Sequence, residues 1–323
     1  MSSRRDFITL LGGAAAAWPL VARAQQRGRT YRIAFLAYAP RQASTHIAFF
    51  DELGRNGFAE GQNLSVVVAG FDFRDELTES LAADIIKVVP DAIVAPESAT
   101  RALQKLTRTI PIVCMTEDML DAGLVPSLAR PAGNTTGISL LSHQLDGKRL
   151  DILTEAAPAA RRVAAIADAT ITPARHLEAL QAAVRARGFE LSVYGVRRPE
   201  ESIPAIDAAK AAGAEAVNFL ATPLTYVVRP TIFARVAELR LPAIYQWPEM
   251  AEEGGLVGYG PRFPEIWRQR ARLLVKVLRG TDPADLPVEQ PTKFELVINL
   301  QAAKAIGHEV PAGLVLRANK VIE

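Results

Sequence analysis

The chain has 323 residues, of which 49% are hydrophobic and 22% are charged. This length exceeds that of a usual single domain, so two domains are expected, and the composition excludes an intrinsically disordered chain. The net charge of +2 comes entirely from the first 24 residues, because the remainder has equal numbers of basic and acidic side chains. A neutral chain has no net electrostatic attraction to nucleic acid or to an anionic membrane, so we predict no nucleic-acid partner.

The first 24 residues have the features of a twin-arginine export signal. Arg4 and Arg5 precede a mildly apolar run, and an A-x-A cleavage site ends at Ala24. The apolar run is shorter than the roughly 20 residues that a spanning helix needs. Cys114 is the only cysteine, so lipid attachment at the cleavage site and an internal disulfide are both excluded. We therefore predict a signal peptide over residues 1–24 and export of the folded chain to the periplasm.

The first half of the chain after the signal alternates between apolar strands and amphipathic helices. The expected strands are 31–36, 64–69, 91–95 and 110–115, and the expected helices are 44–56, 76–89 and 100–109. Strands that alternate with helices of this length indicate βαβ units, hence a parallel sheet with right-handed crossovers.

Residues 121–139 are predicted to carry the chain from one lobe to a second. Leu124 and Leu128 predict one face of a short helix that ends at Pro131 and Gly133. After this stretch the alternation starts again. The expected helices are then 145–156, 173–187, 203–212, 229–240, 264–278 and 301–306, and the expected strands are 162–167, 191–196, 216–220, 242–246 and 294–300.

The predicted fold class is therefore α/β, with two lobes built on parallel sheets. We expect the tail to cross back over the hinge. The N-terminal lobe is expected to comprise residues 29–137 and about 262–285, and the C-terminal lobe residues 138–261 and about 286–323.

The turns that follow the expected strands are the candidate binding site, because open parallel sheets bind ligands outside the carboxyl ends of their strands. The rule selects Tyr38 and the turns 96–100, 116–118, 168–170, 222–225 and 246–247. Ser98 and Thr100 either cap a helix or bind the ligand, and Asp168 is a cap or an acceptor for a ligand amine. Tyr38 and Trp247 either close on the ligand from opposite lobes or are ordinary core aromatics.

No catalytic motif is present in this sequence. There is no G-x-G-x-x-G after a strand, no P-loop, no G-x-S-x-G and no paired-histidine zinc motif. The four histidines are scattered, and the lone cysteine has no acid–base neighbour in sequence. We therefore predict that the protein is not an enzyme and has neither a cofactor nor a metal site.

Several motifs of the chain resemble those of a known family. They are GLVPSLARP at 123–131, GNTTG at 133–137, LVGYGP at 256–261 and DLPVEQPTKFELVINL at 285–300. With these motifs the chain resembles the periplasmic substrate-binding proteins of ABC transporters, in the branch similar to tryptophan- and tyrosine-binding proteins. The resemblance implies a type I periplasmic-binding fold whose two Rossmann-like lobes are joined by three hinge strands. It carries the ligand contacts over, as matched loop positions, to Tyr38, Ser98, Thr100, Thr116, Asp168, Thr170, Thr222 and Trp247.

The resemblance also implies a function. The expected protein is a monomeric receptor that binds a small organic ligand, amino-acid-like or aromatic, and delivers it to an inner-membrane ABC permease. The alternative is an exported α/β enzyme or a ligand-sensing partner of a signalling receptor. The sequence departs from the family pattern at Met119 and Ala132, where proline and glycine are usual, and Glu97, Glu117 and Asp118 make the expected pocket more acidic.

Overall fold

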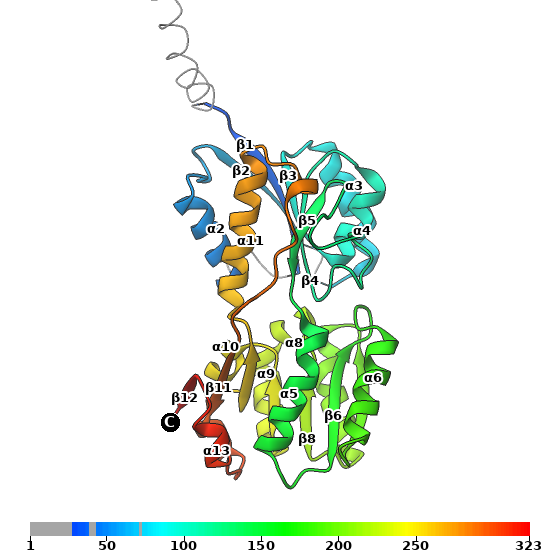
Figure 1. Cartoon of the computed structure of the whole chain (residues 1–323), viewed down its shortest axis with the longest axis vertical. Helices are drawn as coiled ribbons and strands as arrows, with labels where there is room; N and C mark the ends of the chain where they lie inside the picture. Colours follow the sequence, from blue (N-terminus) through cyan, green and yellow to red (C-terminus); the bar gives the residue numbers. More distant parts are fainter. Residues whose placement is uncertain (1–27, 39–42, 71–72) are drawn as a thin grey trace, which may run out of the picture.

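The computed structural model describes residues 28–38, 43–70 and 73–323; the predicted export signal lies outside these residues. Two lobes are stacked along the long axis of the molecule, each built around its own sheet (Figure 1). None of the helices in these ranges has the length and apolar character needed to cross a membrane.

The N-terminal lobe contains a five-stranded parallel sheet in the order β2-β1-β3-β4-β5. Its strands are β1 (Tyr31–Ala37), β2 (Leu64–Gly70), β3 (Ala92–Pro96), β4 (Ile112–Thr116) and β5 (Thr135–Ser139). Its helices are α2 (Ser44–Arg55), η1 (Asp75–Leu77), α3 (Thr78–Lys87), α4 (Glu97–Leu106) and, from the tail, α11 (Phe263–Leu278).

The inner strands β1 and β3 are buried on both faces of the sheet, so they are apolar at nearly every position. Ile33 and Phe35 of β1 pack in the cluster that contains apolar residues of α2 and α11. Ala34 and Leu36 point to the opposite face and pack in the cluster that contains apolar residues of α3 and α4. The period-2 alternation of strand side chains thus divides one apolar segment between two cores.

The C-terminal lobe contains a seven-stranded sheet in the order β12-β11-β10-β9-β8-β6-β7, in which β10 and β11 form the antiparallel pair. Its strands are β6 (Arg162–Asp168), β7 (Glu190–Val196), β8 (Ala216–Phe219), β9 (Ala243–Tyr245), β10 (Val257–Gly260), β11 (Glu295–Asn299) and β12 (Lys320–Ile322). Its helices are α5 (Ser142–Ala156), α6 (Ala174–Arg185), α7 (Ser202–Ala211), α8 (Pro223–Val227), α9 (Arg229–Glu238), α10 (Pro248–Glu252), α12 (Leu300–Ala305) and α13 (Ala312–Val315), with a short 3₁₀ turn η2 (Pro199–Glu201) before α7. A further 3₁₀ turn, η3 (Pro283–Asp285), follows α11 and lies against β5 of the N-terminal lobe.

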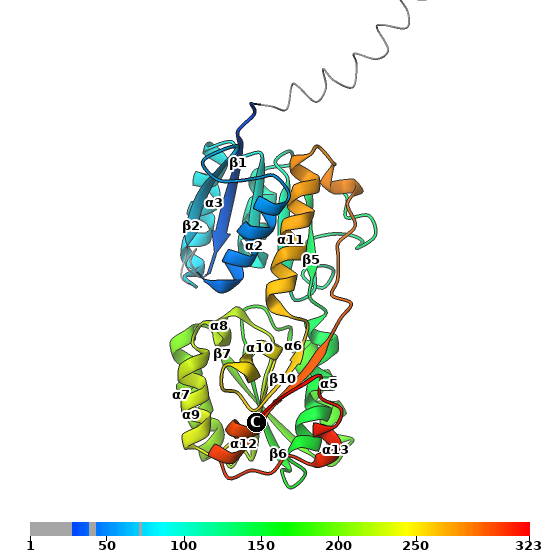
Figure 2. The same cartoon turned by 90° about the vertical axis from the view of Figure 1, so that its left-hand side faces the viewer.

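The chain crosses between the lobes three times, after β5, after β10 and before β11 (Figure 2). The third crossing runs beside the first: Ser139 N donates to Glu289 O at 3.0 Å, and Glu289 N donates to Gly137 O at 2.9 Å. These bonds hold two of the connections together at the hinge. The predicted α/β class with two lobes of mostly parallel strands is confirmed.

The prediction of a short helix around Leu124 and Leu128 is wrong, because residues 117–134 form turns without a helix. Gly123 and Ala132 have φ values of +65° and +57°, which a right-handed helix cannot accommodate. Leu124 instead packs in a small cluster with Cys114 on the N-terminal lobe. The chain leaves this lobe only after Ser139, at the end of β5.

Candidate functional site

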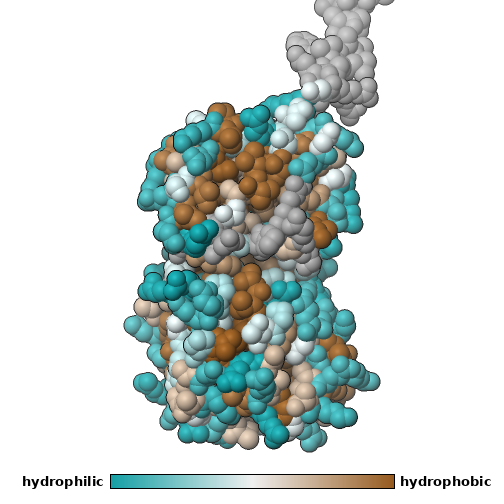
Figure 3. Space-filling model, turned by 180° about the vertical axis from the view of Figure 1, so that it is seen from behind, coloured by the Kyte–Doolittle hydropathy of each residue, from teal (hydrophilic) through white to brown (hydrophobic). Residues whose placement is uncertain are grey.

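A cavity of about 270 Å³ lies between the lobes. Its walls come from the carboxyl ends of β1 and β4, from the loops that follow β8 and β9, and from the first half of α11. Seen from behind, the molecule narrows to a waist between the two lobes (Figure 3). The site is therefore where the strand-end rule for parallel sheets places it.

Four of the eight residues predicted from the sequence line this cavity: Tyr38, Thr116, Thr222 and Trp247. Tyr38 comes from the N-terminal lobe, where its ring stacks on Phe73 with centroids 4.6 Å apart. Trp247 comes from the C-terminal lobe and is 3% exposed. The two rings thus contribute to the cavity wall from opposite lobes, and each also has an aromatic neighbour in the protein.

The other four predicted residues lie outside the wall of this cavity. Ser98 Oγ is 3.1 Å from the Tyr38 hydroxyl, and Thr100 Oγ1 donates to Pro96 O within its own helix at 2.8 Å. Asp168 accepts from Thr170 Oγ1 at 2.6 Å and from Thr222 Oγ1 at 2.7 Å, so both of its oxygens have partners. Asp168 and Thr170 line a smaller adjoining hollow.

Aromatic side chains form one continuous wall across the hinge. Trp247 stacks on Phe263 with centroids 4.3 Å apart and an angle of 16°, and Tyr226 meets the same ring edge-on at 5.0 Å. Trp267, one turn further along α11, contacts His46 of α2 at 4.8 Å. All five residues line the cavity. Such a wall favours a planar or apolar ligand group, because aromatic faces gain most from flat partners.

Two carboxylates line the cavity on the N-terminal lobe. Glu97 accepts from Thr116 Oγ1 and pairs with Arg101 at 2.9 Å. Burial raises the pKa of Glu117 to about 7, although a hydrogen bond from Ser142 and the charge of Arg149 oppose the rise. Glu117 Oε2 is buried and has no partner in the described part of the chain.

One buried arginine also lines the cavity. Arg270 is 2% exposed, and its Nη2 donates to Ala95 O at 2.6 Å and to Val113 O at 2.8 Å. Burial lowers its pKa to about 10, so the guanidinium remains charged at neutral pH.

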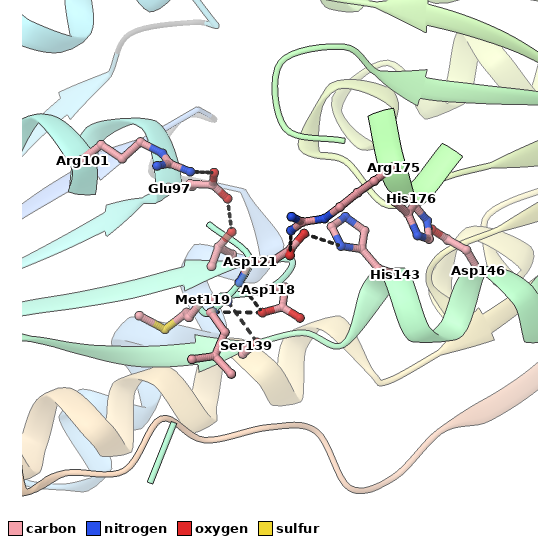
Figure 4. A network of polar contacts seen from close by, with 12 residues as sticks. Glu97, Arg101, Asp118, Met119, Asp121, Ser139, His143, Asp146, Arg175 and His176 are labelled. Atoms are coloured by element: carbon pink, nitrogen blue, oxygen red, sulfur yellow. Dashed lines mark hydrogen bonds and ion pairs between the residues drawn. The ribbon is translucent and has the colours of Figure 1, made fainter. Parts of the chain in front are cut away.

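A polar network lies beside the cavity and joins the two lobes (Figure 4). Asp121, in the loop after β4, forms an ion pair with Arg175 of α6, and His143 Nδ1 lies 3.8 Å from the same carboxylate. His143 stacks on His176 with centroids 4.4 Å apart, and burial together with His176 lowers the pKa of His143. These charged groups therefore connect the two lobes next to the cavity.

The cavity residues on α11 were not found by the strand-end rule. Phe263, Trp267 and Arg270 come from a helix of the tail that packs over the first sheet. A rule that selects residues at the ends of strands therefore does not select them. One signal was present in the sequence. Arg270 lies on the apolar stripe of its helix, between Ile266 and Leu273, where a charged side chain is unusual.

Neither cysteine chemistry nor metal binding is supported by the described residues. Burial raises the pKa of the Cys114 thiol to about 12, so it is not an activated nucleophile. No group of three or more His, Cys, Asp or Glu side chains in the described ranges could hold a metal ion.

Comparison with known proteins gives consistent results. A family profile described as ABC transporter substrate binding protein matches residues 49–322. A tyrosine-binding protein of Clostridioides difficile (strain R20291) is 24% identical over 262 residues, which are 80% of this chain and 75% of the relative.

Solved structures share the fold at low sequence identity. An ABC domain from Streptococcus pneumoniae, in complex with L-Trp, superposes with a TM-score of 0.81 at 19% identity and covers 91% of this chain and all of its own. A conserved domain protein from Vibrio cholerae superposes with a TM-score of 0.82 at 23% identity, with the same coverage.

Proposed function

The chain belongs to the family of ABC transporter substrate-binding proteins, and from this premise we propose that it captures an amino-acid-like or aromatic ligand between its lobes. The observation that carries the proposal is the cavity at the hinge, lined from both lobes and walled by stacked aromatic rings. Two relatives point to the same ligand class, since one is a tyrosine-binding protein and another was solved with L-Trp.

Binding would act through closure of the lobes. A ligand that contacts both lobes favours the closed state in proportion to its differential affinity for that state. Residues from both lobes line the cavity, so a ligand of suitable size meets Tyr38 and Trp247 together. We assign the remaining predicted residues, Ser98, Thr100, Asp168 and Thr170, to support of this wall, because their hydrogen bonds run to residues of the site or its adjacent turns.

The receptor role includes delivery of the ligand to an inner-membrane permease, which is the role of the family. We further propose that the receptor works as a monomer, without nucleic acid and without catalysis. The rival function, an exported α/β enzyme, requires an activated nucleophile or base in the cavity. The high pKa of Cys114 argues against this thiol as the nucleophile. The Glu117 carboxyl, with a pKa raised to about 7, is a candidate base, so a ligand panel decides between the two functions.

A ligand panel tests the receptor proposal. The mature protein is titrated by calorimetry with free amino acids and aromatic acids, and each mixture is then analysed by mass spectrometry. Saturable binding of one ligand per chain, with the ligand unchanged, is expected. Conversion of a bound compound to product supports the enzyme instead, and the absence of any small-molecule ligand refutes the receptor.

Export to the periplasm through the twin-arginine route is proposed from Arg4 and Arg5. Replacing both by lysine keeps the positive charge but removes the motif. We expect the uncleaved precursor to accumulate in the cytoplasm, as seen by fractionation and immunoblotting. Undiminished mature protein in the periplasm would show that another route exports the chain.

A further inference from the structure

Two arginines are fully buried in the described part of the chain, and only one of them has a counter-ion. Arg149 of α5 is 0% exposed and forms an ion pair with Asp146 at 2.8 Å, itself 1% exposed. Its Nε donates to Tyr259 O at 2.9 Å, and its Nη2 donates to Gln246 O at 3.4 Å. Arg149 therefore has both a counter-ion and a partner for each nitrogen.

Arg270 has no such counter-ion. Its hydrogen bonds are the two that Nη2 donates to main-chain carbonyls, and these oxygens carry no net charge to balance the guanidinium. Among the described residues no carboxylate lies within ion-pair distance of Arg270, and its Nε is buried without a hydrogen-bond partner. The guanidinium lies over the ring of Trp267, with its Cζ 5.3 Å from the ring centroid. The neighbouring Cys114 does not supply the charge, because its thiol stays neutral.

The Trp267 ring attracts the guanidinium but carries no net charge, so it is not a counter-ion. A buried charge without a counter-ion costs several kcal/mol, so a fold retains one where something else compensates it. Arg270 lines the cavity between the lobes, and so do two tryptophans with unused donors. Nε1 of Trp267 and Nε1 of Trp247 are buried and lack a hydrogen-bond partner in the described ranges. The cavity wall thus includes a cation that lacks a counter-ion, which matches an anionic ligand group. Of the two carboxylates on the same wall, Glu97 is already paired with Arg101 and accepts from Thr116, and burial raises the pKa of Glu117 to about 7.

We propose that Arg270 is the anion-binding residue of this cleft and that the ligand must carry a carboxylate, which supplies the counter-ion missing from the fold. This inference rests on the proposed receptor function and narrows it. Amino acids and aromatic acids qualify as ligands, whereas amines and neutral aromatics of the same shape do not. Nη2 is already used by Ala95 and Val113, so the carboxylate takes the remaining guanidinium donors.

Matched ligand analogues separate the contribution of a carboxylate to binding from that of the aromatic ring. The mature protein is titrated by calorimetry with L-tyrosine, 3-(4-hydroxyphenyl)propionate, tyramine and 4-ethylphenol, and with the corresponding indole series from L-tryptophan to 3-ethylindole. These compounds share a ring and differ in whether a carboxylate, an ammonium group, both or neither is present. We expect the carboxylate-bearing member of each pair in at least one series to bind at least tenfold more tightly than the member without it.

Three variants assign this preference to one side chain. Arg270→Gln removes the charge but keeps an amide donor for the carbonyls of Ala95 and Val113, and it should lower the affinity for carboxylate probes at least tenfold. Arg270→Lys keeps the charge and should retain more of the preference. Arg268→Gln is the matched control on the same helix: Arg268 is paired with Glu265 outside the cavity, so its loss should leave every affinity within twofold.

Melting curves establish that each variant is folded, and if Arg270→Gln does not fold, the wild-type probe series and Arg270→Lys decide. The inference is overturned if no carboxylate probe binds, if tyramine or 4-ethylphenol binds as tightly as L-tyrosine, or if folded Arg270→Gln keeps its affinity for the acids. Binding of an amine or a neutral ring at one per chain, as tightly as the matched acid, refutes the role of Arg270 and leaves the receptor function intact. Failure of the receptor itself appears differently, as the absence of any ligand in the wider panel.

Discussion

Glu117 allows a quantitative test of how the cleft is charged. Its carboxyl is buried beside the cavity, and burial raises its pKa from 4.5 to about 7. Between these two values the folded protein binds a proton that the unfolded chain has lost. The contribution of Glu117 to the free energy of unfolding therefore falls as the pH rises through this window, and this contribution is highest below pH 4.5. A shift of this size corresponds to about 3 kcal/mol at roughly 1.4 kcal/mol per unit, most of it between pH 5 and pH 8.

The perturbation is Glu117→Gln, which has the same shape and no titrating group. Urea unfolding of the ligand-free protein gives the free energy of unfolding for wild type and variant at pH 5, 6, 7 and 8. The variant minus wild-type difference should increase by about 2 to 3 kcal/mol from pH 5 to pH 8, because only the wild type loses stability to the ionisation of this carboxyl. The difference also cancels the contribution of His143, which titrates in both proteins.

The matched control is Glu178→Gln, since Glu178 is exposed on α6. Its difference from wild type should stay constant within about 0.5 kcal/mol across the same range, as is usual for a surface substitution. If the Glu117→Gln difference is equally flat, the carboxyl ionises at its ordinary pH in the fold. The cleft would then hold a permanent negative charge, and our account of its electrostatics would be wrong.

Three further predictions concern the walls, the mouth and the hinge of the cleft. Tyr38→Ala and Trp247→Ala should each weaken ligand binding about two- to tenfold, which corresponds to the roughly 0.5–1.5 kcal/mol of a stacked aromatic pair. The two effects should be non-additive, because both residues act on the same closure of the lobes. Unchanged affinity in both folded single mutants, measured by calorimetry, would show that these two rings do not hold the ligand. Arg175→Ala breaks the ion pair with Asp121 between the lobes. Because Arg175 is exposed, such a pair contributes ~0.2–1 kcal/mol, so we expect at most about a fivefold loss of ligand affinity, and this loss should disappear in 0.5 M salt. A loss that does not depend on salt would contradict an electrostatic role of Arg175 in holding the lobes together. Gly260→Ala places a Cβ 2.1 Å from Gln246 O and should lower the free energy of unfolding by about 1–3 kcal/mol, whereas Gly54→Ala, in open space on α2, should raise it by roughly 0.5–1 kcal/mol; equal effects in urea titrations would show that the close approach at Gly260 is absent.

The sequence determined the alternation of strands and helices, because that pattern is local. A run such as Tyr31–Ala37 is apolar at nearly every position, which fits a strand buried on both faces, and the helices between such runs show one apolar face. The same alternation, with the rule that parallel strands bind ligands at their carboxyl ends, selected four residues that line the cavity: Tyr38, Thr116, Thr222 and Trp247. That they contact a ligand stays a prediction. These inferences need only the order of elements along the chain.

Local pattern failed where long-range packing decides the outcome. Leu124 and Leu128 have helical spacing, but the backbone at Gly123 and Ala132 has positive φ, and the segment is held by the cluster around Cys114 rather than by helical hydrogen bonds. The sequence of residues 121–134 alone does not show which other part of the chain they pack against, so this packing could not be predicted from it.

Only the tertiary structure decided what completes the site. Helix α11 follows β10 in sequence yet packs on the sheet of the other lobe, and this return places Phe263, Trp267 and Arg270 in the cavity. Whether a buried arginine has a counter-ion is likewise a tertiary fact: Asp146 lies one helical turn from Arg149, whereas the carbonyls that Arg270 reaches are more than 150 residues away in sequence. The physical reason is that charge compensation depends on distance in space, and sequence spacing fixes that distance only within a single helix or strand.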